Sequence, residues 1–367
     1  MNMFLGKNNH NYRVNNNKKG KKIGEVQLMI RRRLKEDERA MEDNYSVRTD
    51  LAVEAREIYN EANEGEIDGI ESEEYLDHNI KVNWVRIKNE NGAKVIGKPV
   101  GEYVTLEYGD FVYYDGDRII ELSEVVAKEL SKLINLQEDM TALVVGLGNW
   151  NITPDAVGPQ VVSKIMVSRH LKEYVPDDID EGVRPVCAIA PGVLGLTGME
   201  TSEIIKGVVD RIKPSLIICI DALASRKTQR VNRTIQMGNT GIAPGAGVGN
   251  KRAELSEETL GVPVIAIGVP TVVHAGTLAN DTIDMLLDSL IKSSTKDSAF
   301  YNMLKDVDKE EKSALIKEVL DPTLGGMVVT PKEIDKVIES VSKIIANGIN
   351  IALQPALTLD DINTYLN

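Results

Sequence analysis

The sequence has few of the side chains that carry nucleophilic or disulfide chemistry. Among 367 residues there are two cysteines and four histidines, and aromatic residues make up only 4%. Both cysteines, Cys187 and Cys219, lie inside apolar runs, where cysteine usually packs as a small hydrophobe. A disulfide framework and a Cys–His nucleophile are therefore disfavoured, and the core must consist mainly of aliphatic residues and methionine.

Several familiar site motifs are also missing. The Gly146-x-Gly148 pair has Asn151 where a dinucleotide fingerprint needs its third glycine, and the glycines that precede Lys251 lack the Walker spacing. Neither His-Glu-x-x-His, Cys-x-x-Cys nor Gly-x-Ser-x-Gly occurs. No secretory signal is visible, and the longest apolar run, 260–273, contains two prolines and is too short to span a bilayer. We expect a cytoplasmic protein without a membrane partner.

Charge is divided unevenly along the chain. The formal net charge is −13, but residues 1–50 hold 12 Lys+Arg against 7 Asp+Glu, whereas the remainder holds 31 against 49. The segment 1–50 is therefore basic by +5 and the rest acidic by −18. An acidic body argues against direct nucleic-acid binding by the chain as a whole.

Hydrophobic patterning predicts an α/β fold. Near-continuous apolar strands joined through helices are typical of a mostly parallel sheet with helices on both faces. Two alternating segments, 80–88 and 102–108, predict added strands before this region, and helical spacing predicts C-terminal helices after it. One of these helices is expected to begin at Thr330-Pro331 and to end at Gly348. The predicted apolar strands are 143–146, 186–190, 216–220 and 262–269. The predicted helices before, between and after them are 122–136, 159–171, 201–212 and 280–292.

Two aspartates follow apolar strands at one predicted edge of the sheet. Four loops, 146–158, 191–200, 221–252 and 268–278, leave that edge, where open α/β sheets bind ligands. Asp155 lies in the first loop and Asp221 begins the third. Two carboxyls that meet there can share a proton and divide acid and base roles, although a strand-end aspartate can also simply cap the next element.

Taken together, six segments resemble the germination protease family of spore-forming bacteria, also called GPR endopeptidase or spore protease. The resemblance extends from about residue 44 to the C-terminus, and motifs of this length in this order are specific. The matching segments are Ser46–Ala55, Gly146–Pro159, Ala190–Ser202, Ile220–Ala224, Gly241–Arg252 and Glu258–Thr271.

The resemblance implies an aspartic-type endopeptidase that degrades small acid-soluble spore proteins during germination, in the cytoplasm of the forespore and spore core. The fold implied is similar to hydrogenase-maturation proteases and to phosphorylase/hydrolase-like folds. The family's two active-site aspartates fall on Asp155 and Asp221, and no cofactor or metal is implied. A homotetramer is expected, made as a self-processing zymogen whose propeptide is cut at Asp50–Leu51. Residues 1–50 are then an N-terminal extension and propeptide, and residues 51–367 a single protease domain.

A cut after Asp50 requires a site that accepts an acidic side chain. Cations of the predicted third loop are candidates for this substrate-binding role because they can pair with a carboxylate. The candidates are Arg226, Arg230, Arg233, Lys251 and Arg252.

The chain departs from the family pattern at two places, and these leave alternatives open. His274 stands where the family is expected to carry Asp, so a metal-dependent endopeptidase with Asp155, Asp221 and His274 as ligands is one alternative. Residues 1–40 extend beyond a propeptide of the usual size, and Met41 is an alternative start. An inactive relative that binds spore proteins, and a phosphorylase-like transferase suggested by the fold alone, are the remaining alternatives.

Overall fold

In the computed structural model the chain divides into two units, Met1–Arg48 and Thr49–Asn367. All the residues that the structure describes belong to the second unit. Residues 1–49, and with them most of the predicted propeptide, lie outside the described residues. Those described are 50–62, 67–109, 115–135, 137, 139–174, 182–245, 252–296, 298–306, 312, 315–316, 319 and 327–366.

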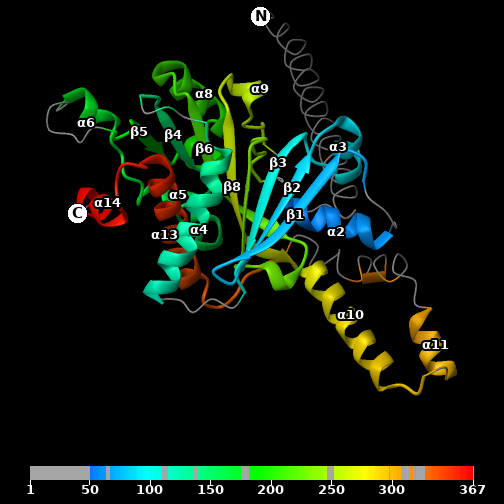
Figure 1. The fold of residues 1–367 in the computed structure, drawn as a ribbon. Helices are drawn as coiled ribbons and strands as arrows, with labels where there is room; N and C mark the ends of the chain where they lie inside the picture. The colour runs from blue at the N-terminus through cyan, green and yellow to red at the C-terminus, as the bar shows by residue number, and fades with distance from the viewer. Residues whose placement is uncertain are drawn as a thin grey trace, which may run out of the picture. The chain divides into compact units, whose positions relative to one another are not determined.

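A nine-stranded sheet forms the centre of the second unit (Figure 1). The strand order is β1-β2-β3-β7-β8-β6-β4-β5, and β9 pairs with β8. The strands are β1 Ile70–Asp77, β2 Ile80–Ile87, β3 Gly101–Glu107, β4 Ala142–Gly146, β5 Val186–Ile189, β6 Leu216–Ser225, β7 Thr234–Gly238, β8 Val264–His274 and β9 Val328–Val329.

The predicted α/β class is confirmed. Strands β5, β4, β6 and β8 pair in parallel, and they are the apolar strands that the sequence predicts. The added strands β1, β2, β3 and β7 extend the sheet by antiparallel pairing on the other side of β8. The two alternating segments of the sequence became β2 and β3, whereas β7 lies inside a segment predicted to be a loop.

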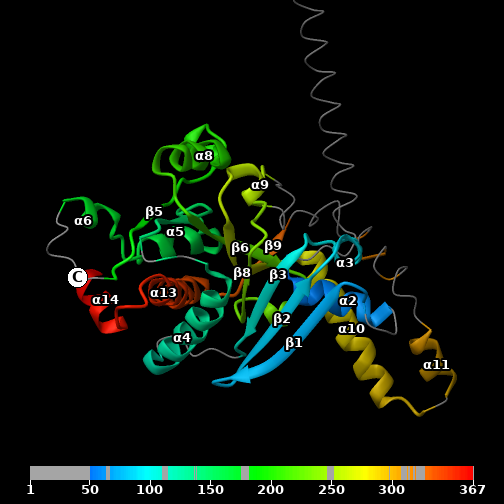
Figure 2. The ribbon, with the colours of Figure 1, turned by 45° about the horizontal axis from the view of Figure 1, so that its top comes forward.

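Helices cover both faces of the sheet, as Figure 2 shows. Helices α4, α5 and α13 pack on the face to which Ile218 and Ile220 point, and α8 packs on the opposite face, against Ile217 and Cys219. Helices α2 and α3 cover that opposite face over the antiparallel strands. The helices are α2 Ala52–Ala62, α3 Glu90–Ile96, α4 Gly116–Leu133, α5 Val157–Val162, α6 Arg169–Tyr174, α7 Leu194–Thr197, α8 Thr201–Ile212, α9 Glu257–Leu260, α10 Ala275–Ser293, α11 Ala299–Lys305, α13 Ile334–Leu353 and α14 Leu359–Leu366.

Strands β6 and β8 are longer than the sequence predicts. They continue to pair with each other as far as Ser225 and Val273, past a β-bulge after Leu223. The predicted starts of loops 221–252 and 268–278 are therefore wrong, because these residues belong to strands. Asp221 lies within β6 rather than after it. The extended ends of β6 and β8 form backbone hydrogen bonds with each other. The residue pattern of one strand alone does not show that this pairing exists.

Helix α13 also differs from its predicted ends. It begins at Ile334, three residues after Pro331, and continues through Gly348 to Leu353. The prediction that Gly348 ends the helix is wrong, because this glycine faces α4. A Cβ placed there would collide with the side chain of Val126. The glycine therefore permits close helix packing and does not act as a cap.

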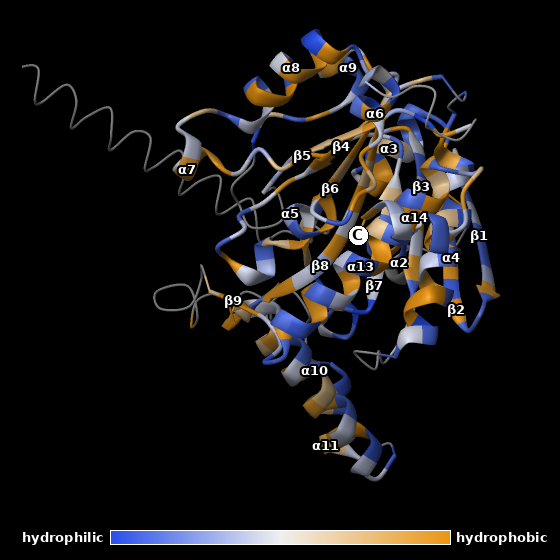
Figure 3. Ribbon diagram, turned by 90° about the vertical axis from the view of Figure 1, so that its left-hand side faces the viewer, coloured by the Kyte–Doolittle hydropathy of each residue, from blue (hydrophilic) through white to orange (hydrophobic). Residues whose placement is uncertain are grey.

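Helices α10 and α11 extend away from the sheet, and apolar and polar residues alternate along them in Figure 3. None of the residues of α10, all of which are described, is buried. Met285 and Leu286 are 66% and 58% exposed. Within the part of the chain that the structure describes, no helix has the length and apolar character needed to cross a bilayer.

Candidate active site

Asp155 is held in a tight loop after β4. It ends a short 3-10 helix, η1 (Thr153–Asp155), and the Asn149 N–H donates to its Oδ2 at 2.8 Å and to its main-chain oxygen at 3.1 Å. Gly148 in the same loop has φ +107°, and a Cβ there would collide with the Asp155 carbonyl oxygen. The loop can close around Asp155 only because Gly148 lacks a side chain.

A second glycine sets this loop against β6. Gly158 lies in the first turn of α5, and a Cβ there would collide with the carbonyl oxygens of Leu147 and Ile220. Helix α5 therefore rests directly on the ends of β4 and β6. Because Asp155 precedes α5 and Asp221 follows Ile220, this packing places Asp155 near enough for its charge to raise the pKa of Asp221.

Asp221 is almost fully buried, at 5% exposure. Its Oδ1 accepts a hydrogen bond from the Ala222 N–H at 2.9 Å, and the Gly245 N–H also donates to the carboxyl. Burial, followed by the negative charge of Asp155, raises the pKa of Asp221 to about 8. Asp221 therefore keeps its proton at neutral pH.

Asp155 is half-buried, and burial is also the largest influence on its pKa. Burial raises its pKa above the usual value, but the Asn149 N–H stabilises the ionised form. The pKa values of both carboxyls are thus raised, and the value of about 8 for Asp221 leaves that carboxyl protonated at neutral pH.

Asp50 lies at the same site. Its Oδ2 accepts a hydrogen bond from the Ala224 N–H, on β6, at 3.3 Å, and its charge is among the causes that raise the pKa of Asp221. Burial raises the pKa of Asp50 itself, while nearby Lys98 and His274 lower it. The following residue, Leu51, is fully buried. The structure therefore places Asp50, at the predicted propeptide boundary, near Asp221.

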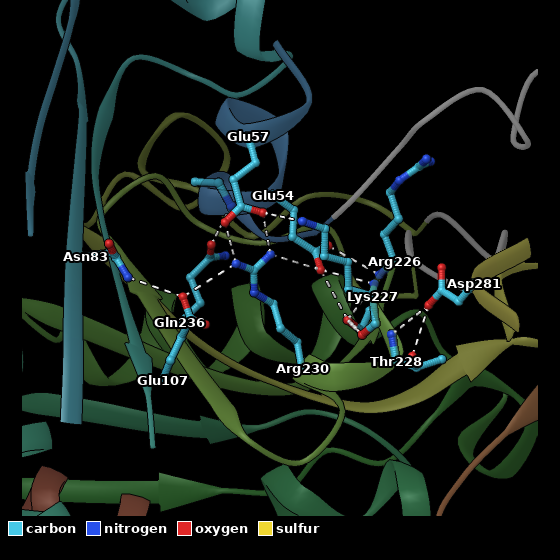
Figure 4. Close-up of polar contacts among 12 residues, drawn as sticks. Glu54, Glu57, Asn83, Glu107, Arg226, Lys227, Thr228, Arg230, Gln236 and Asp281 are labelled. Atoms are coloured by element: carbon cyan, nitrogen blue, oxygen red, sulfur yellow. Dashed lines mark hydrogen bonds and ion pairs between the residues drawn. The ribbon is translucent and has the colours of Figure 1, made fainter. Parts of the chain in front are cut away.

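The most buried candidate cation, Arg230, is engaged with acidic side chains, as Figure 4 shows. Its guanidinium contacts both Glu57 oxygens, at 2.9 and 2.6 Å, and lies 3.4 Å from Glu54 and 3.5 Å from Glu107. Burial of Glu57 is outweighed by its bonds to Arg230 and Lys227, which lower the pKa of Glu57 to about 2. This cluster attaches α2 to the chain that follows β6.

The other candidate cations lie in different settings. Arg252 forms an ion pair with Glu200 at 3.5 Å, and the backbone N–H of Arg226 donates to Glu54 at 3.2 Å. The Arg233 carbonyl accepts a hydrogen bond from the N–H of Tyr108, the residue after β3, at 3.1 Å. Lys251 lies outside the described residues. Their role in substrate binding stays a prediction.

Sequence reasoning missed Glu54 and Lys98. Glu54 is fully buried and accepts bonds from Ser225, Arg226 and Lys227 at 3.2–3.3 Å, so it organises the turn after β6. Lys98 follows the C-cap of α3 and reaches Asp50. Glu54 lies in the matching segment Ser46–Ala55, which was the available signal, whereas Lys98 belongs to none of the six segments.

The alternative metal site requires Asp155, Asp221 and His274 to gather around one point. Among the described residues no group of three or more His, Cys, Asp or Glu side chains has the arrangement needed to hold a metal ion. The structure therefore adds no support for that alternative.

Comparisons with known proteins agree with the sequence motifs. A family model described as "Germination protease" matches residues 48–304 and 288–366. Germination proteases of Clostridium tetani and Clostridium perfringens are 64% and 62% identical, over 88% of this chain and 100% of theirs. That of Bacillus pumilus is 43% identical over 88% of this chain and 97% of its own. Among solved structures, a NiFe hydrogenase maturation protease of Thermococcus kodakarensis is 18% identical, with a TM-score of 0.26, over 53% of this chain and 99% of its own.

Proposed function

The chain belongs to the germination protease family, and from this premise we propose that it cuts peptide bonds with Asp155 and Asp221 as a general acid–base pair. Membership makes it an endopeptidase of spore germination. One observation supports the aspartate mechanism: burial, followed by the negative charge of Asp155, raises the pKa of Asp221 to about 8. Carboxyls with shifted pKa values are typical of acid–base active sites.

In the proposed reaction, ionised Asp155 is the base and protonated Asp221 the acid. Asp155 removes a proton from water as the water oxygen bonds to the carbonyl carbon. Asp221 donates its proton to the peptide as the C–N bond breaks, which gives a carboxyl group and an amine. A proton passing from Asp155 to Asp221 restores the starting state, and their apparent pKa values belong to the pair.

We further propose that the chain is made as a zymogen that cuts itself at Asp50–Leu51. The charge of Asp50, which helps to raise the pKa of Asp221, supports this proposal, because it shows that the residue before the predicted cut lies near Asp221. An acidic residue followed by an apolar one, Leu51, is the corresponding cleavage preference. The proposed substrates are small acid-soluble spore proteins that offer such sites, in the cytoplasm of the forespore and spore core.

Assembly is proposed to be a homotetramer, with neither a membrane nor a nucleic acid as a direct partner. The exposed apolar side chains of α10, including Met285 and Leu286, support self-association, because a helix without buried residues otherwise leaves this surface in water.

The test follows the full-length chain by intact mass with and without a chelator. Wild type should lose residues 1–50, whereas Asp155→Asn and Asp221→Asn should each slow this loss by at least about 10³-fold. Asp210→Asn is the matched control, because its carboxylate is exposed on α8. Equal loss in wild type and Asp155→Asn would refute the aspartate pair, and loss that a chelator blocks would favour the metal alternative.

A further inference from the structure

One side chain bonds to the backbone on both sides of Leu51, the residue that follows the proposed cut. Gln236, on β7, donates from Nε2 to the Asp50 carbonyl oxygen at 2.9 Å and accepts from the Ala52 N–H through Oε1 at 2.6 Å. Only one orientation of the amide can make both bonds, because one end must donate and the other accept. Gln236 therefore spans the bond proposed to be cut.

Lys98 supplies a second donor to the same oxygen. Its Nζ lies 3.1 Å from the Asp50 carbonyl oxygen. Burial lowers the pKa of Lys98, while the carboxylates of Asp50 and Glu54 favour its charged form. A partly desolvated ammonium interacts more strongly with a developing negative charge than one in water. The Asp50 carbonyl oxygen is thus bound by two donors at once.

The sheet register places Gln236 in the same row as Asp221, with β8 between them. Gly268 of β8 pairs with Asp221 of β6 on one side and with Gln236 of β7 on the other. Residues in one row of a sheet point to the same face, and two strand spacings separate them by about 10 Å. A peptide lying across β8 therefore meets Gln236 from one side and Asp221 from the other.

We propose that Lys98 and Gln236 form the carbonyl-binding site of this protease, for its own propeptide bond and for the acidic cleavage sites of its substrates. This inference rests on the proposed function. Both donors touch the oxygen that becomes negative when water adds to the carbonyl carbon, so they stabilise that charge. Because a carbonyl oxygen has two lone pairs and both are occupied, the Asp221 proton goes to the Leu51 nitrogen.

Recognition of the acidic residue follows from the same geometry. The Asp50 carboxylate accepts the Ala224 N–H at 3.3 Å, and Lys98 favours its ionised form. Lys98 thus serves both the side chain and the carbonyl of the residue before the cut. This assigns to Lys98 the role that the sequence suggested for the arginines after β6.

A purely structural role for Gln236 makes a different prediction. The Ala52 N–H is the first donor of α2, and helix starts are stabilised when a side chain accepts such a group. If Gln236 only capped α2, a variant that keeps the acceptor would process normally. Gln236→Glu is that variant, since its carboxylate still accepts from Ala52 but no longer donates to the Asp50 carbonyl.

The experiment measures self-processing of full-length chains at pH 7 by intact mass, with thermal unfolding of each unprocessed protein as a check on folding. Lys98→Met and Gln236→Glu should each slow processing by about 10²–10³-fold, as loss of one oxyanion donor does elsewhere. Lys98→Arg, which keeps a cationic donor, should recover part of the rate. Lys206→Met removes an exposed lysine on α8 and should match wild type.

The outcomes separate this inference from the proposed function. If Lys98→Met and Gln236→Glu both process within about threefold of wild type while Asp155→Asn does not process, the carbonyl-binding site is wrong and the aspartate pair stands. If wild type itself fails to cut at Asp50–Leu51, or Asp155→Asn cuts normally, the proposed function fails first. Should Lys98→Met unfold, the comparison of Lys98→Arg and Gln236→Glu with wild type decides.

Discussion

At the scale of single residues, burial distinguishes the two identical side chains that we propose as acid and base. Asp155 and Asp221 have the same chemistry, but Asp221 lies within a buried strand whereas Asp155 lies in a half-exposed turn. The difference in solvation separates their pKa values, and the charge of Asp155 increases the separation. Sequence predicted the pair, but no sequence feature distinguishes the roles.

This difference predicts a bell-shaped pH dependence of self-processing. As pH falls through the raised pKa of Asp155, the base becomes protonated and the rate falls. As pH rises through about 8, Asp221 loses its proton and the acid is lost, so the rate falls again. Intact mass measured from pH 4 to 10 tests this, with thermal unfolding at each pH as the control. An unchanged rate between pH 7 and 10 would contradict Asp221 as the acid.

The sequence shows that position 230 is an arginine, but it does not show which side chains this arginine contacts. Its position after an apolar strand made it a candidate for binding an acidic substrate. In the folded chain Glu57, Glu54 and Glu107 surround it instead, and they come from two distant elements, α2 and β3. A sequence shows the cation, but only packing shows which anions are already beside it.

At the scale of elements, the apolar strands and α8 were predictable because their patterns are continuous. Helix α8 spans Thr201–Ile212, as predicted. The predicted ends of elements were wrong where an element is stabilised by contact with another element distant in the sequence. The ends of β6 and β8 pair with each other, β7 is held between β3 and β8, and α13 continues through a glycine that packs on α4.

Two helix glycines give a matched test of this packing. A Cβ at Gly348 would meet Val126, whereas a Cβ at Gly207 on α8 would have nothing within 4 Å. We expect Gly348→Ala to destabilise the fold by about 1–2 kcal/mol, because overpacking by about 1–3 kcal/mol exceeds the helix-propensity gain. Gly207→Ala should stabilise it by about 0.5–1 kcal/mol. Urea unfolding measures both, and a stabilising Gly348→Ala would show that the two helices can separate without penalty.

At the scale of the whole molecule, helix α10 exposes apolar surface: none of its residues is buried, and Leu278, Met285, Leu286 and Leu290 are exposed. Self-association would remove these side chains from water, and the proposed tetramer would provide the partner surface.

We therefore expect Met285→Glu and Leu286→Glu, made together, to lower the molar mass of the assembly in light scattering, because they place charge on this apolar surface. The control is Leu76→Glu, which changes another exposed leucine, 73% exposed at the end of β1. An assembly of unchanged mass after the α10 substitutions would show that the helix lies outside the interface.

The sequence by itself determined the α/β class, the parallel strands, the pair Asp155 and Asp221, and the family. These depend on continuous apolar runs and on long motifs, which are local properties of the chain. Tertiary structure alone decided that Asp221 is the protonated partner, that Arg230 is paired with glutamates, and that Lys98 and Gln236 hold the Asp50 carbonyl. Each of these depends on burial or on contacts between residues distant in the chain, and solvation and distance exist only once the chain has folded.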